Sequence, residues 1–306
     1  MSSATSGPPQ PTFVCIGAPK CGTTWLYQQL ASHPQIWLPP EKEVRYFNKR
    51  YPIENSEAPP GRRMGLFGLF RDHPRRVITR ALRRSLSPRA GFPIRWMIKF
   101  LSGPGDFHWY ASLFDPARGR VSGDITPFYA SLPAYAVQEI REGFPDLKVI
   151  FLMRDPVARA WSNARMMLPL MLERPLAQIT EADFADYLAR PSAHVEGHYL
   201  HALDTWGRAY PQKQFLIEYQ DHISTDPQRT LDRITTHLGV EPRAIPAATL
   251  AKRVNAGSAR SHTQMPPAIR QWLSQYYLTE LEQLAERCGR PVTDWLERAQ
   301  AEAVKR

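Results

Sequence analysis

A short stretch near the start of the chain, GAPKCGTT at residues 17–24, has the composition of a loop that binds phosphate groups. Gly17 and Gly22 keep the glycine spacing of the nucleotide-binding pattern G-x-x-x-x-G-K-[ST]. Thr23 stands where that pattern has its lysine, and the only lysine of the stretch is Lys20, inside the loop. Such loops bind anions through backbone N–H groups and the positive end of the following helix. The stretch therefore predicts an anion site in which Lys20 reaches a transferred or leaving group.

The residues around this lysine extend the same chemistry. The hydroxyls of Thr23 and Thr24 can donate hydrogen bonds to the terminal oxygens of an anion, and Trp25 can pack against a base or a ribose. For Cys21, the backbone is expected to matter more than the sulfur. The glycine spacing alone also occurs in tight structural turns, so the surrounding elements must separate the two interpretations.

A candidate general base follows in the charged and aromatic stretch EKEVRYFN, residues 41–48. Glu43 is flanked there by Lys42 and followed by the aromatic pair Tyr46-Phe47, which favours a catalytic interpretation over a solvated surface acid. Glu41 is its nearest competitor and is expected at the surface.

Two further residues remain open as participants. His108, in DFHWY, is an alternative base, although a lone histidine beside aromatic residues is more often structural. Asp124 either orients Lys20 or an acceptor, or only caps a turn.

The elements that must position these residues alternate between strands and helices. Strands are expected at 13–17, at 121–129 with an end near Pro127, at 148–156 with an end at Arg154, and at 214–219. Helices are expected at 23–33, at 134–147 with a stop at 143–145, at 157–168 and at 226–240 with an end at Gly239. The last fifty or so residues indicate a loop and then helices.

This alternation predicts an α/β fold with a parallel sheet covered by helices on both faces. Ligands in such folds bind beyond the carboxyl ends of the strands. The Gly17 loop, residues 124–127 and the pair Arg154-Asp155 all fall at such ends, so one composite site is expected.

Four stretches, in family order, resemble motifs of the sulfotransferases that use 3′-phosphoadenosine 5′-phosphosulfate (PAPS). GAPKCGTTWL resembles the 5′-phosphosulfate loop. FLMRDPVARAWSNARM resembles the 3′-phosphate motif, with Arg154 at a strand end and Ser162 eight residues later. LPPEKEVRYFN is similar to the K-E-x-x-[FY]-F region of heparan-sulfate-type Golgi enzymes and their bacterial relatives, with Glu43 at the place of the catalytic glutamate. GDITPFY is similar to the family segment G-E-x-[TS]-P-x-Y.

The resemblance implies a P-loop-like parallel sheet in one domain, residues 13–306, preceded by a flexible tail at 1–12. It implies PAPS as donor and adenosine 3′,5′-bisphosphate as product. Arg154 and Ser162 would hold the 3′-phosphate, and Asn255 and Ser258, in RVNAGSAR, match a late cofactor-covering loop more loosely. The remaining nucleotide contacts would come from the residues of the glycine loop: Lys20, Cys21, Gly22, Thr23, Thr24 and Trp25.

The implied mechanism is in-line attack by an acceptor hydroxyl, with Glu43 as general base and Lys20 at the leaving phosphate oxygen. A metal-independent site is expected, because a sulfonate carries fewer negative oxygens than a phosphoryl dianion. Heparan-type enzymes often have lysine after the acid of the fourth motif, and here that position is Ile125. The acceptor site of those enzymes therefore cannot be assigned unchanged to this chain. A glycan, a lipid headgroup and a small natural product all remain open as the acceptor.

The composition favours an ordinary globular enzyme. The chain has 306 residues, of which 43% are hydrophobic, and three cysteines without the spacing of a disulfide framework. The polar, proline-rich start lacks the pattern of a signal peptide, and no apolar run has the length of a membrane span, so a cytoplasmic protein is expected.

The net charge of +10 is concentrated in one segment. Residues 62–99 contain ten arginines and one lysine against one acidic residue, within an expected basic helical insertion at about 50–105. This segment is either a solvated insertion or a patch for an anionic acceptor or the inner face of a membrane, since apolar residues interleave with its arginines. Nucleic-acid binding is not expected, because the rest of the chain is balanced in charge.

Two other functions remain as alternatives. A nucleotide kinase or NTPase would need Mg²⁺ and ATP. The sequence lacks the Gly-Lys-[ST] of the pattern typical of such enzymes, which makes this function less favoured. A non-catalytic protein that binds anions or membranes could retain the same fold.

Overall fold

The structure, a computed structural model, describes residues 10–52, 94–117, 119–246 and 264–304. Most of the basic segment 62–99, together with Asn255 and Ser258, lies outside the described residues.

The described residues form a five-stranded sheet in the order β2-β3-β1-β4-β5, and every neighbouring pair of strands is parallel. The strands are β1 (Phe13–Gly17), β2 (Ile36–Trp37), β3 (Val121–Ile125), β4 (Lys148–Met153) and β5 (Phe215–Tyr219). The central strands β1 and β4 are apolar along nearly their whole length and almost entirely buried, as expected for parallel strands covered on both faces.

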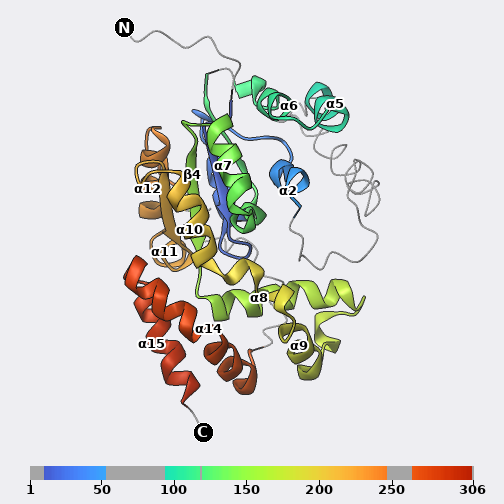
Figure 1. Cartoon of the computed structure of the whole chain (residues 1–306), viewed down its shortest axis with the longest axis vertical. Helices are drawn as coiled ribbons and strands as arrows, with labels where there is room; N and C mark the ends of the chain where they lie inside the picture. The colour runs from blue at the N-terminus through green and yellow to red at the C-terminus, as the bar shows by residue number, and fades with distance from the viewer. Residues whose placement is uncertain (1–9, 53–93, 118, 247–263, 305–306) are drawn as a thin grey trace.

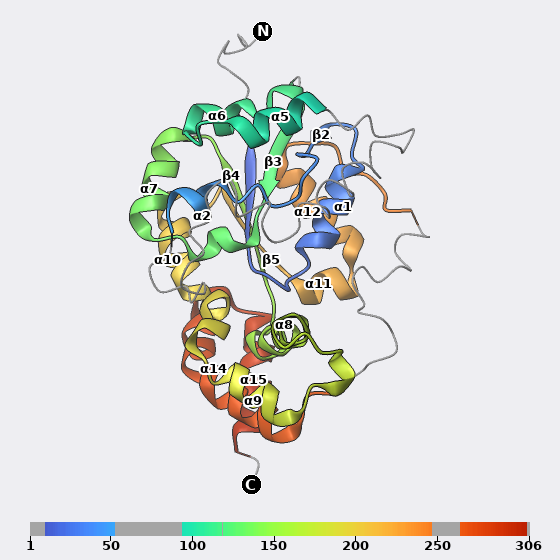
Figure 2. The same ribbon diagram turned by 90° about the vertical axis from the view of Figure 1, so that its right-hand side faces the viewer.

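Helices cover both faces of this sheet, as Figures 1 and 2 show. α7 (Ala134–Gly143) and α10 (Tyr199–Ala209) pack together on one face. α1 (Thr23–Ala31), α11 (Gln220–Thr225) and α12 (Pro227–Leu238) lie on the other. The predicted α/β architecture is confirmed.

Further helices lie at the two ends of the sheet. Beyond the carboxyl ends of the strands lie α8 (Pro156–Met171), α9 (Glu181–Leu188), α14 (Pro267–Cys288) and α15 (Val292–Ala303). Near the opposite end lie α5 (Ile94–Ser102) and α6 (Phe107–Ser112), and α2 (Tyr46–Arg50) lies beside the sheet. Short 3₁₀ turns complete the described chain at Asp115–Ala117, Pro127–Ser131, Leu176–Gln178, Pro191–Ala193 and Val195–Gly197.

The predicted element ends are shifted at two places. The strand expected to end near Pro127 ends at Ile125, because a 3₁₀ turn begins at Pro127 itself. The helix expected at 157–168 starts one residue earlier and continues to Met171, through Pro169. Among the described residues, no helix combines the length and apolar composition needed to cross a bilayer.

Candidate functional site

The predicted anion-binding loop connects β1 to α1 at the carboxyl edge of the sheet. Gly17 has φ +151°, and a Cβ at that position would lie 2.6 Å from the carbonyl oxygen of Pro127, so only glycine fits there without a shift of backbone. Gly22 precedes α1 with φ +96°, and no side chain caps the helix. The first N–H groups of α1 therefore have no partner within the helix and remain suited to an anion.

Lys20 lies in the loop with φ +71°, and its Nζ is 3.4 Å from Sδ of Met166 on α8. Its carbonyl oxygen accepts a hydrogen bond of 3.2 Å from Nη1 of Arg154, which follows β4. Burial lowers the pKa of Lys20, and the charges of Arg154 and Arg165 lower it further. Among the described residues no carboxylate forms an ion pair with Lys20 or Arg154. This concentration of positive charge fits an anionic group.

Tyr199, the first residue of α10, joins the loop to the end of β4. Its hydroxyl donates a 2.8 Å hydrogen bond to the carbonyl oxygen of Arg154 and lies 3.7 Å from Sγ of Cys21. Both Tyr199 and Cys21 are fully buried, and burial raises the pKa of each. The sequence does not predict Tyr199 as a site residue, because it lies 45 residues from Arg154 in a segment without a recognisable motif.

The other predicted nucleotide contacts lie on α1 and α8. Thr23 is 5% exposed, whereas Thr24 and Trp25 are half-buried, and the Trp25 ring packs in part against the core. Ser162 is half-buried on α8, the helix that begins two residues after Arg154. Arg154 and Ser162 thus belong to one strand-end and helix unit at the carboxyl edge.

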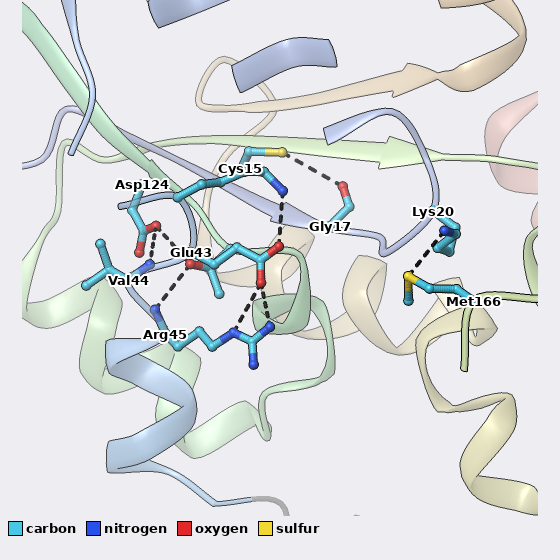
Figure 3. Close-up of polar contacts among 10 residues, drawn as sticks. Cys15, Gly17, Lys20, Glu43, Val44, Arg45, Asp124 and Met166 are labelled. Atoms are coloured by element: carbon cyan, nitrogen blue, oxygen red, sulfur yellow. Dashed lines mark hydrogen bonds and ion pairs between the residues drawn. The ribbon is translucent and has the colours of Figure 1, made fainter. Parts of the chain in front are cut away.

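Glu43 lies in a turn with left-handed backbone, at φ +67°, beside the carboxyl end of β1 (Figure 3). Lys42 Nζ donates to Oε1 at 3.0 Å, and Arg45 donates to Oε2 from Nε at 3.1 Å and Nη2 at 2.6 Å. Burial alone raises the pKa of Glu43, but the charges and hydrogen bonds of Arg45 and Lys42 outweigh it and hold the pKa below its ordinary value. The carboxylate therefore stays ionised at neutral pH. Oε2 already accepts two hydrogen bonds and Oε1 only one, so a lone pair on Oε1 can accept a further hydrogen bond.

Asp124, at the end of β3, is 1% exposed, and its partners are protein groups. It accepts hydrogen bonds from the backbone N–H of Val44 and from the hydroxyls of Thr126, Tyr129 and Tyr110. Of the two roles considered for Asp124, contact with Lys20 or an acceptor and support of a turn, these contacts favour the second.

His108 is exposed on α6, and no described hydrogen bond or ion pair joins it to Lys20 or Glu43. Its neighbours Trp109 and Tyr110 are buried and pack against Tyr46. The structure therefore brings Glu43, not His108, to the carboxyl edge near the loop.

Two further features of the described residues concern metal binding and cavities. The described residues contain no group of three or more His, Cys, Asp or Glu side chains placed to hold a metal ion. A cavity of about 830 Å³ follows β5 and is lined by residues such as Tyr219 and Arg233, but by none of the loop residues, Glu43 or Arg154.

Comparisons with known proteins point to one family. The chain is 25% identical to the Bos taurus bifunctional heparan sulfate N-deacetylase/N-sulfotransferase 2 over 236 residues, 65% of this chain and 26% of that protein. It is 26% identical to the Dictyostelium discoideum membrane-associated sulfotransferase kil1 over 204 residues, 67% of this chain and 32% of that protein. The matches thus cover about a quarter to a third of the length of these two relatives.

A solved structure and a family model extend the comparison to most of the chain. The crystal structure of a sulfotransferase from Alicyclobacillus acidocaldarius matches 94% of this chain and 98% of its own chain. The TM-score is 0.65 and the sequence identity is 22%, so the two proteins share a fold. The model of the Sulfotransferase family matches residues 11–243. The loop at Gly17, Arg154 and Glu43 all lie within that range, and the chain belongs to the sulfotransferase family.

Proposed function

We propose that the chain transfers a sulfuryl group from PAPS to the hydroxyl of a glycan, a lipid or a small natural product. The observation that carries the proposal is the grouping of Lys20, Arg154 and the N-terminus of α1 at one edge of the sheet, with the ionised Glu43 beside it.

The residues present fit an anionic nucleotide. Lys20 and the N–H groups at the start of α1 would hold the 5′-phosphosulfate, because they combine a positive charge with unpaired backbone donors. Arg154 and Ser162 would hold the 3′-phosphate, since the guanidinium group suits bidentate binding of phosphate. When bound, PAPS would supply the sulfuryl group for in-line attack by the acceptor hydroxyl.

The chain's own residues supply positioning, charge and a base. Glu43 accepts the hydroxyl proton at a carboxylate oxygen, a role that typically contributes about 10²- to 10⁴-fold to a rate. Lys20 stabilises negative charge on the leaving phosphate oxygen. We propose that no metal takes part, because a sulfuryl group needs less neutralisation of charge than a phosphoryl dianion.

The choice of hydroxyl over amine, and the site of action, are also proposals. Relatives of the chain carry both kinds of name, N-sulfotransferase and heparan sulfate glucosamine 3-O-sulfotransferase. We infer a cytoplasmic enzyme with peripheral contact to the inner face of the membrane through 62–99. The described part of that segment supports this with the exposed Arg95 and Ile98 on α5, the latter 59% exposed.

The donor is tested by calorimetry of the purified protein with adenosine 3′,5′-bisphosphate and with ATP·Mg. We expect the bisphosphate to bind in the absence of metal and at least about tenfold more tightly, a difference of about 1.4 kcal/mol. Tighter binding of ATP·Mg would favour a kinase or NTPase instead. The acceptor is tested by mass spectrometry after incubation with PAPS and matched hydroxyl and amine compounds; sulfated amines alone would contradict O-transfer.

A further inference from the structure

The turn that carries Glu43 is held by two side chains from the end of β3. Val44 donates its backbone N–H to Oδ1 of Asp124 at 3.3 Å, and Arg45 donates its N–H to Oγ1 of Thr126 at 3.3 Å. These are the first two N–H groups after Glu43, so the turn is fixed immediately beside the candidate base (Figure 3).

The turn needs such support because its backbone is unusual. Glu43 and Arg45 have φ of +67° and +55°, values that residues other than glycine seldom adopt. A backbone of this kind persists only where the surroundings over-determine it, and such residues concentrate at functional sites.

Asp124 and Thr126 are themselves firmly placed. Asp124 lies opposite Val14 of β1, and the N–H of Thr126 donates to the carbonyl oxygen of Cys15 at 3.0 Å. Thr126 also donates its hydroxyl to Oδ1 of Asp124 at 2.8 Å. β1 thus orders both the anion-binding loop at its end and the two side chains that hold the base.

Two buried tyrosines fix the second oxygen of Asp124. Tyr129 donates to Oδ2 at 2.7 Å and Tyr110 at 3.3 Å, and both rings are fully buried. A buried carboxylate without a cation partner is costly unless hydrogen bonds satisfy it, and here four donors do so. No described ion pair involves Asp124, so its hydrogen bonds are directed to the turn and its supports.

We propose that Asp124 and Thr126 are positioning residues for the transfer reaction. They hold the Glu43 turn in a fixed position relative to the loop at residues 17–24. The inference rests on the proposed function of Glu43 as general base. Neither residue needs to touch the donor or the acceptor, because both act through the two N–H groups that follow Glu43.

The test is Thr126→Val, which keeps the shape of the side chain and removes the acceptor for the N–H of Arg45. We expect kcat to fall about 10- to 100-fold, since a small misplacement of a catalytic group costs about that much. Affinity for adenosine 3′,5′-bisphosphate should stay within about twofold, because the Lys20 loop is untouched. Thr126→Ser keeps the hydroxyl and should restore kcat.

Thr235→Val is the matched control, because Thr235 is also fully buried and donates its hydroxyl to a backbone carbonyl, at 3.0 Å, but on α12. An unchanged kcat in Thr126→Val, or an equal loss in Thr235→Val, overturns the proposal. If Thr126→Val fails to fold, Thr126→Ala replaces it with the same expectations, because it also removes the Oγ1 acceptor of the Arg45 N–H.

Hydrogen exchange separates this inference from the proposed function. We expect the amides of Val44 and Arg45 to exchange on the order of tenfold faster in Thr126→Val than in the wild type, whether or not an acceptor is known. Wild-type protein that transfers nothing contradicts the proposed function, while unchanged exchange at both amides contradicts the positioning role itself.

Discussion

Glu43 is surrounded by charges that decide its protonation. Burial raises the pKa of Glu43, but Arg45 and Lys42, which contact its two carboxylate oxygens, bring it below its ordinary value. A base of low pKa is always available at neutral pH but accepts a proton weakly, so the acceptor hydroxyl must be held in hydrogen-bonding reach of it.

Arg45→Ala should move the acid limb of the pH profile. Removing the cation raises the pKa of Glu43, so protonation will inactivate the enzyme at a higher pH than in the wild type. The measurement is the pH profile of kcat/KM for the acceptor, from about pH 4 to about pH 8. Arg50→Ala, which removes an arginine at the end of α2 that pairs with Glu139, should leave the limb in place. A limb that does not move, or moves to lower pH, would argue against Glu43 as base.

Arg154→Ala tests the 3′-phosphate site. Loss of a charge-assisted hydrogen bond costs about 1.5–3 kcal/mol, so adenosine 3′,5′-bisphosphate should bind about 10- to 100-fold more weakly. Affinity for AMP, which lacks the 3′-phosphate, should change far less. Arg174→Ala, which removes a surface arginine paired with Asp183, is the control for calorimetry. Equal losses for the two nucleotides would show that Arg154 acts only through its bond to the Lys20 carbonyl.

At the scale of elements, the β1–loop–α1 unit depends on the absence of a side chain at Gly17. Gly17→Ala should lower the unfolding free energy by about 1–3 kcal/mol for two reasons. The φ angle is unfavourable for alanine, and the added Cβ would lie too close to the Pro127 carbonyl oxygen. Gly119→Ala has the unfavourable φ of +80° but nothing within 4 Å of the added Cβ, and should cost less. Thermal or urea unfolding compares them; a larger loss at Gly119 would contradict the packing explanation.

Elements with a strong local signal could be predicted from the sequence. β4 is a continuous apolar run, and α12 begins with the Asp226 side chain bound to the N–H of Arg229 and ends at Gly239 with φ +77°. α9 was missed although Thr180 and Asp183 form a readable capping box. β2 has only two residues and no periodicity to detect.

The sequence predicts candidate site residues only where it carries motifs, and the roles of these residues stay predictions. Lys20, Glu43 and Arg154 were identified from local patterns, and the structure brings them to one edge of the sheet. The hydrogen bonds of Tyr199, and those that Asp124 and Thr126 accept from the Glu43 turn, were not predictable in this way. They join residues that are 45 to 178 positions apart in the sequence. Such long-range pairs are set by tertiary packing, which no local pattern encodes.

At the scale of the whole molecule, the helices α8, α9, α14 and α15 lie beyond the carboxyl ends of the strands, at the edge of the sheet that carries the loop (Figure 1). Arg159 of α8 is fully buried, donates to the carbonyl oxygen of Ala193 at 3.1 Å and lies 3.4 Å from the Tyr277 hydroxyl of α14. These contacts fix α8, the helix that bears Ser162 and Met166, relative to α14. The fold of the family does not by itself identify the acceptor, because acceptor specificity depends on the residues of the site and not on the fold.

The most direct test is sulfuryl transfer from PAPS to a hydroxyl acceptor, followed by mass spectrometry, in wild type, Glu43→Gln and the matched control Glu41→Gln. We expect a product heavier by one sulfonate from the wild type and from Glu41→Gln. Glu43→Gln should bind adenosine 3′,5′-bisphosphate normally but form product about 10²- to 10⁴-fold more slowly. Equal rates in Glu43→Gln and wild type, or no product from wild-type protein with any hydroxyl acceptor, would contradict the proposed mechanism.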